Sequence, residues 1–173
     1  MKKRIISIAV VFSFFICMIV IPEKQVAASE EAKIVDGSYL TEEDSAFGMT
    51  ESRTRGKHLM TGECSITNAG IGRIYAYAAT TANHEVDYIK VIIYVERYLE
   101  DVDAWGYVDA WVEVVNNDYY VATSKSLEVE PGYYYRVHAD HVVQEGDDPP
   151  EETFSVTDGI FIAPASSSTT PST

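Results

Sequence analysis

Histidine is the side chain best suited to acid–base chemistry or metal binding near neutral pH, and the chain contains four. They are His58, His84, His138 and His141. Successive side chains of a β-strand point to opposite faces, so His138 and His141, three positions apart, are expected on opposite faces. Zinc requires three or four converging ligands, and this spacing does not bring them together. The sequence therefore predicts no metal site and no cofactor.

The serines and paired acids form no recognised catalytic pattern. No Gly-x-Ser-x-Gly segment, which would hold a nucleophilic serine on a sharp turn, surrounds Ser65, Ser124, Ser126 or Ser155. The adjacent acids 147–148 and 151–152 flank two prolines, a pattern typical of a solvated turn. We therefore expect that the protein is not an enzyme. A hydrolase with an unrecognised acidic site is the alternative, because two carboxylates across a cleft cannot be recognised in one sequence.

Acidic loops could also bind calcium, which takes about six to eight oxygen ligands. Segments 100–103 and 147–152 supply carboxylates at expected hairpin ends. Neither segment matches an EF-hand loop. The simpler interpretation is an acidic turn in an acidic protein, and calcium binding stays open.

Apolar and polar residues alternate with a period of two between residues 57 and 163, whereas helical periodicity is nearly absent. The expected strands are His58–Thr67, Gly72–Thr80, Val86–Leu99, Ala104–Asn116, Tyr119–Val129, Tyr133–Val143 and Thr153–Ala163. Seven strands without a helix to cover a parallel sheet predict an all-β, antiparallel, immunoglobulin-like sandwich.

The third and fourth expected strands predict a hairpin with aromatic residues on its outer face. With a turn at 100–103, paired residue numbers sum to 203, so that Ile92 faces Trp111 on the outer side. The aromatic residues that this register places outside, and that we expect to form a binding surface, are Tyr94, Tyr98, Trp105, Tyr107 and Trp111. Exposed aromatic patches bind sugars or form protein interfaces. Alternatively, another strand or segment 29–56 covers these rings, which then only stabilise the sheet.

A second signature follows the fifth expected strand. Pro131 and Gly132 end that strand, and Tyr135 then leads an alternating run. This spacing resembles the corner before strand F in fibronectin type III and immunoglobulin-like sandwiches, where a tyrosine hydroxyl bonds to upstream backbone. The resemblance implies that Tyr135 is a structural residue.

A wider resemblance runs from Gly62 to Ile162. It rests on strand 86–99 followed by Trp105, on segment 132–137 followed by His141, and on segment 152–160. These segments resemble an uncharacterised family of small secreted Gram-positive proteins, a domain of unknown function. The resemblance implies export and the fold, and it assigns no catalytic residue.

Residues 1–28 predict a secretory signal peptide. Three basic residues precede an apolar run over residues 5–21, and Ala28 ends a small-residue site for cleavage before Ser29. An uncleaved anchor is the alternative, because this run lies at the short limit for spanning a bilayer. Beyond it we expect an acidic disordered lead-in at 29–56, one β-sandwich domain at 57–163 and a Ser/Thr/Pro tail at 164–173.

Cleavage would leave a strongly acidic chain with one cysteine. The leader removes four of 13 bases and one of 27 acids, so 9 bases and 26 acids remain and the net charge is −17. This charge disfavours nucleic-acid and anionic membrane partners. Cys17 leaves with the leader, and Cys64 alternates in phase with Met60 and Ile66, which predicts a buried thiol without a disulfide partner.

These observations predict a secreted, extracellular, non-catalytic β-sandwich that binds an unknown extracellular protein or glycan. The alternatives are the hydrolase described above and a self-associating surface structural protein. Sequence alone does not identify the ligand.

Overall fold

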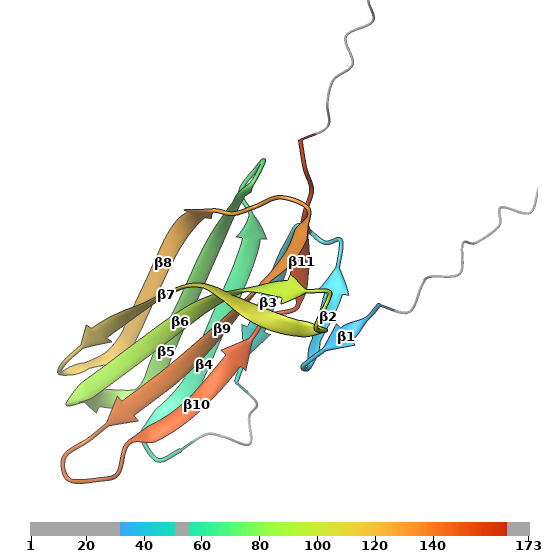
Figure 1. Cartoon of the computed structure of the whole chain (residues 1–173). Coiled ribbons are helices and arrows are strands. Elements are labelled where there is room, and N and C mark those ends of the chain that lie inside the picture. The colour runs from blue at the N-terminus through green and yellow to red at the C-terminus, as the bar shows by residue number, and fades with distance from the viewer. Residues whose placement is uncertain (1–31, 51–55, 166–173) are drawn as a thin grey trace, which may run out of the picture. The chain divides into compact units, whose positions relative to one another are not determined.

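The computed structural model describes residues 32–50 and 56–165, which are all strand, turn or loop. The expected signal peptide and most of the expected tail lie outside these residues. Figure 1 shows the strands. They are β1 (Ile34–Val35), β2 (Ser38–Thr41), β3 (Ser45–Met49), β4 (Leu59–Asn68), β5 (Arg73–Val86), β6 (Tyr88–Leu99), β7 (Ala104–Val115), β8 (Asp118–Glu128), β9 (Tyr133–Gln144), β10 (Glu151–Val156) and β11 (Gly159–Ile162). The described part of the chain contains no helix that could cross a membrane.

The strands form two sheets, as an all-β sandwich requires. The larger has seven strands in the order β1-β2-β11-β9-β6-β7, with β10 also paired to β9, and the smaller has the order β3-β4-β5-β8. Apolar side chains from both sheets, such as Ile66, Ala76, Ile93 and Val137, are fully buried between them. Cys64 belongs to this core, so the buried thiol is confirmed.

The expected strands between residues 58 and 143 correspond to β4–β9, while the last expected strand is divided. Both β10 and β11 pair antiparallel with β9, and Thr157 and Asp158 separate them. At this break the Thr157 backbone N–H donates to the Val137 carbonyl. The expectation of an entirely antiparallel sandwich is wrong at one pair, because β2 runs parallel to β11.

Residues 32–50 of the expected lead-in 29–56 are not disordered, contrary to what the composition of this segment suggested, because β1, β2 and β3 lie within them. The segment has too few apolar residues to build a core of its own. Instead, β2 pairs with β11 and β3 pairs with β4, at the borders of the two sheets. Ser38 and Val35 are buried there. Residues 32–50 are therefore ordered by the sheets that they extend.

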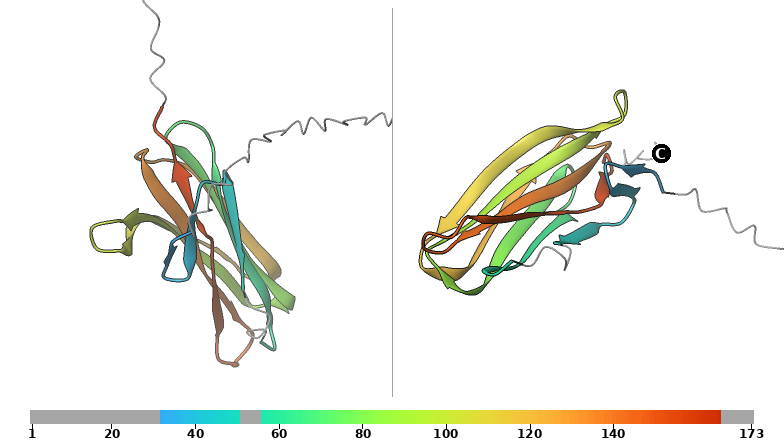
Figure 2. Two further views of the ribbon diagram at one scale, coloured as in Figure 1. Left: turned by 90° about the vertical axis from the view of Figure 1, so that its right-hand side faces the viewer. Right: turned by 90° about the horizontal axis from the view of Figure 1, so that it is seen from below.

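The β6–β7 hairpin has the expected turn, but its register changes along its length. Tyr98 pairs with Trp105, as the sum of 203 predicts. A bulge follows at Val108, and beyond it Ile93 pairs with Trp111 instead of Ala110. One extra residue moves every following side chain to the other face. The tip of this hairpin projects from the sheet in the left view of Figure 2.

Tyr135 connects the two sheets at the expected corner. Its side chain is almost fully buried, and its hydroxyl donates to the Glu130 carbonyl at 2.7 Å. Burial is the first cause that raises the pKa of Tyr135. The predicted hydrogen bond to upstream backbone is therefore confirmed.

Candidate functional site

The outer face of the seven-stranded sheet, which points away from the core, carries an exposed group of aromatic and polar side chains. Cross-strand pairing places Asp140 of β9 between Ile92 of β6 and Phe154 of β10. One step along the sheet, His138 of β9 lies beside Tyr94 of β6. Because outer-face residues alternate with core residues along each strand, a rigid sheet holds these five side chains together.

The rings on this face form a short stack. The ring centroids of Tyr94 and His138 are 5.6 Å apart, and those of His138 and Phe154 are 5.7 Å apart. Phe154 ends the stack with 61% of its surface exposed. The Nε2 atom of His138 has no hydrogen-bond partner, although Asp140 Oδ1 lies 3.5 Å away. The stack therefore offers the open ring face of Phe154, while His138 Nε2 is a buried atom beside Asp140.

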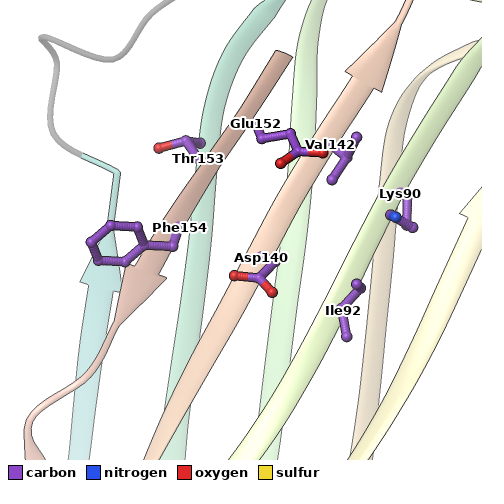
Figure 3. Close-up of a pocket in the computed structure, with 7 residues that line it drawn as sticks. All are labelled: Lys90, Ile92, Asp140, Val142, Glu152, Thr153 and Phe154. Atoms are coloured by element: carbon purple, nitrogen blue, oxygen red, sulfur yellow. The ribbon is translucent and has the colours of Figure 1, made fainter. Parts of the chain in front are cut away.

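Two adjoining hollows surround this stack. The first, about 340 Å³, is lined by Lys90, Ile92, Asp140, Val142, Glu152, Thr153 and Phe154. Figure 3 shows Phe154 at one side, the Glu152 side chain extending from β10 towards β9, and Lys90 on β6. The second hollow, about 520 Å³, shares Asp140 and Phe154 with the first and continues to Arg136 and Asp36. The pKa of Tyr94 is raised, by burial first and then by the charge of Asp140.

Of the five residues predicted to bind, Tyr98 and Trp105 are on the outer face but covered by the N-terminal strands. Tyr98 is only 7% exposed, and the Lys33 ammonium donates to its hydroxyl at 2.6 Å. The Trp105 indole N–H donates to the Val35 carbonyl, and the Arg136 guanidinium lies 4.5 Å from the Trp105 ring centroid. Lys33 and Val35, which belong to segment 29–56, thus cover these rings, as the alternative interpretation held.

Trp111 is not on the outer face, because the bulge at Val108 turns it inwards. It packs against the core, and its indole N–H donates to the Thr123 hydroxyl of the opposite sheet at 3.1 Å. Tyr107, which precedes the bulge, stays outside and is 71% exposed. Only Tyr94 and Tyr107 of the predicted set therefore lie on the accessible face, and of these Tyr94 alone belongs to the stack.

One comparison with known proteins places the chain in a family. A family of unknown function, DUF6147, matches residues 26–159. The chain belongs to DUF6147. No curated protein matches it. The likeness to a domain of unknown function that the sequence suggested is thereby confirmed, and it brings no assigned ligand.

The sequence did not predict Phe154, Asp140 and His138 as residues of this candidate site. Phe154 and Asp140 lie on strands that the alternation predicted, but their proximity depends on the pairing of β9 with β10. His138 was considered only as a metal ligand together with His141. The alternation of side chains could have placed Phe154 and His138 on the outer face. Phe154 precedes the buried Ser155, and His138 lies between the buried Val137 and Ala139.

His141 lies inside the sandwich of the DUF6147 domain, on the opposite face from His138, as their spacing predicted. The Ser155 hydroxyl lies 2.8 Å from His141 Nε2, and the Thr80 hydroxyl lies 2.9 Å from its Nδ1. The Thr80 hydroxyl in turn donates to the Lys90 carbonyl, so Nδ1–H donates to Thr80 and Nε2 accepts from Ser155. Burial lowers the pKa of His141 to about 4. Although a serine–histidine pair resembles catalytic machinery, His141 and Ser155 are 0% and 2% exposed, so no substrate reaches them.

A second histidine cluster joins β4, β5 and the loop before β10. His58, which is buried, lies 3.0 Å through Nδ1 from His84 Nε2 and 2.9 Å through Nε2 from Asp148 Oδ2. His84 Nδ1 lies 2.7 Å from the Glu85 carbonyl. Through His58, these contacts connect β5 to the loop before β10.

The acidic loop is bound to the sheet more closely than a solvated turn would be. Glu151 accepts hydrogen bonds from the backbone N–H groups of Lys57, His58 and Leu59. Burial acts to raise the pKa of Glu151, but these three donors outweigh it and lower the pKa. Hydrogen bonds from Lys57 and His58 lower the pKa of Asp148. These carboxylates hold the loop in place.

Proposed function

We propose that the chain is a secreted, non-catalytic binding module with an immunoglobulin-like fold, and that it binds an extracellular glycan or protein. Its binding surface is the outer face around Phe154. The observation that carries this proposal is the exposed Phe154 ring between two hollows that share Asp140. Ligand sites combine apolar surface with a few placed polar groups, and this face has both on a rigid sheet.

The fold assignment is supported by the strand order and the tyrosine corner. The sheets β3-β4-β5-β8 and β9-β6-β7 with β10 divide the chain as two Greek-key sheets do. Such sandwiches are common in extracellular recognition modules. The net charge of −17 after cleavage supports solubility and disfavours nucleic acid and anionic membranes as partners.

Secretion and origin among small Gram-positive exported proteins are part of the proposal and are supported by the pattern of residues 1–28. Expression of the full chain in a Gram-positive host tests it. Mass spectrometry of the culture medium should find a protein beginning near Ser29. Membrane-bound material that retains residues 1–28 would show an anchored protein instead.

Binding through the outer face is tested with the purified protein on glycan and peptide arrays. Wild-type protein should bind at least one array member saturably, and Phe154→Ala should weaken that binding about tenfold. Phe47→Ala is the matched control, because Phe47 is 59% exposed on β3 in the other sheet. Equal loss in both variants, or no binding at all, contradicts the proposal. Turnover of an array substrate would favour the hydrolase, and large assemblies in sedimentation would favour the structural protein.

A further inference from the structure

The first hollow presents charges of both signs that do not pair with each other. Lys90 supplies donors from β6, whereas Asp140 and Glu152 supply acceptors from β9 and β10. Among the described residues, no ion pair joins Lys90 to either carboxylate. The Lys90 ammonium lies instead 5.9 Å from the Tyr88 ring centroid. Within the described part of the chain, Lys90 and Glu152 therefore present unpaired charges to the hollow, and Asp140, which also lies 3.5 Å from His138 Nε2, lines the same hollow.

This mixture selects against charged ligands. A cationic ligand would meet the Lys90 ammonium, and an anionic ligand would meet the two carboxylates at short range, where like charges repel. A neutral ligand that both donates and accepts hydrogen bonds satisfies all three groups. Ligand hydroxyl groups have this double capacity, since each donates once and accepts twice.

The apolar part of the hollow adds a shape requirement. The Phe154 ring is open to solvent, and Ile92 and Val142 lie across the sheet from it. A pyranose sugar has an apolar C–H face and hydroxyl groups around its rim. Its face stacks on an aromatic ring, while its rim reaches the surrounding donors and acceptors.

The second hollow extends the same surface. It shares Asp140 and Phe154 with the first, and it adds the imidazole ring of His138, whose Nε2 atom is itself buried. Its cation, Arg136, is already held by Glu96 at 2.7 Å and by Asp36 at 2.9 Å. The Arg136 charge is thereby compensated, so the surface stays suited to neutral ligands over a length greater than one sugar.

We propose that the hollows around Phe154 bind a neutral oligosaccharide, with one pyranose ring stacked on Phe154 and its hydroxyls bonded to Lys90, Asp140 and Glu152. This inference rests on the proposed binding function and names the ligand class of the same face.

Isothermal titration of the full chain with defined hexamers tests it. The neutral probes are cellohexaose, chitohexaose, xylohexaose and mannohexaose, and the charged probes are hexalysine and hexagalacturonate. At least one neutral probe should bind. Phe154→Ala should weaken that binding about tenfold, as loss of a stacked ring implies, while Phe154→Tyr and the control Phe47→Ala should leave it within about twofold.

The variant Lys90→Met separates the ligand classes, because it keeps the stem and removes the charge. It should weaken a neutral sugar about three- to tenfold through a lost hydrogen bond, whereas it would strengthen binding of a cationic ligand. Should Phe154→Ala fold poorly, nuclear magnetic resonance of the wild type still decides, because the Phe154 and His138 ring signals should shift with the sugar. If only a charged hexamer binds, and Phe154→Ala weakens its binding, the sugar inference is overturned but the proposed binding function stands. If no hexamer and no array member binds, both the sugar inference and the proposed binding function are overturned.

Discussion

His138 and His141 lie three residues apart on β9 and experience opposite surroundings. His141 is fully buried between the sheets, and both of its ring nitrogens have hydrogen-bond partners. His138 lies on the outer face between two aromatic rings, and its Nε2 has no such partner. Buried polar groups that lack partners destabilise a fold, so the interior satisfies them. On the outer face His138 Nε2 is an exception, a buried atom without a hydrogen bond that lies 3.5 Å from Asp140 Oδ1.

The largest difference between the two faces should appear at Trp111 and Tyr107 of β7. Trp111→Ala removes a ring that packs against the core and a bond to Thr123, so it should lower the free energy of unfolding by about 2–4 kcal/mol. Tyr107→Ala, at a ring that is 71% exposed, should cost less than about 0.5 kcal/mol. Urea titration measures both values. Equal effects would mean that the bulge at Val108 does not turn Trp111 inwards.

The sequence predicted the sheets better than it predicted the site. Alternation predicted strands β4–β9, the buried Cys64 and the side chain directions of His138 and His141, because these depend on local period and apolar phase. The bulge at Val108 could not be read, since a single extra residue leaves both halves of β7 alternating. The cover over Trp105 comes from a polar segment some 70 residues earlier. Phe154 and Asp140 meet only through strand pairing, which is a long-range property.

The next prediction concerns the interior histidine and pH. His141 is neutral in the folded protein down to about pH 4, whereas an unfolded histidine takes up its proton near pH 6.5. The unfolded state therefore binds more protons between these values, so stability is full above pH 6.5 and falls as the pH drops towards 4. The loss contributed by His141 should reach about 3 kcal/mol.

Nuclear magnetic resonance can follow His141 separately from the other histidines. Its ring signals should stay unchanged until the pH approaches 4, and chemical denaturation at each pH should show the falling stability. The lowered pKa values of Asp148 and Glu151 contribute stability that is lost as the pH falls from the ordinary carboxylate pKa of about 4 towards the lower folded-state values. Titration of His141 near pH 6.5 would show that the Thr80–His141–Ser155 network is open to water.

The adjacent residues Tyr134 and Tyr135 also allow an exposed side chain to be compared with a buried one. Tyr135→Phe leaves the Glu130 carbonyl without its buried donor, and it should cost about 1–3 kcal/mol. Tyr134 donates to Glu42 at 2.8 Å in an exposed contact, so Tyr134→Phe should cost less than about 0.5 kcal/mol. Differential scanning calorimetry of both variants measures the difference. An unchanged thermal unfolding midpoint for Tyr135→Phe would mean that the hydrogen bond of Tyr135 to Glu130 does not stabilise this fold.

The smallest expected effect on stability is the one most informative about function. Phe154→Ala should change the free energy of unfolding by less than about 0.5 kcal/mol, because an exposed ring leaves no cavity when it is removed. Phe47→Ala should behave alike, since the two rings are 61% and 59% exposed. Urea titration of the two variants tests this equality. A loss of 2 kcal/mol or more for Phe154 alone would make the ring part of the structure, held by His138, and its exposure would then need no ligand. Equal and small losses in the free energy of unfolding would mean that a polar side chain could replace Phe154 without harm to the fold. Binding would then be the reason for an exposed phenylalanine beside Asp140 and Lys90.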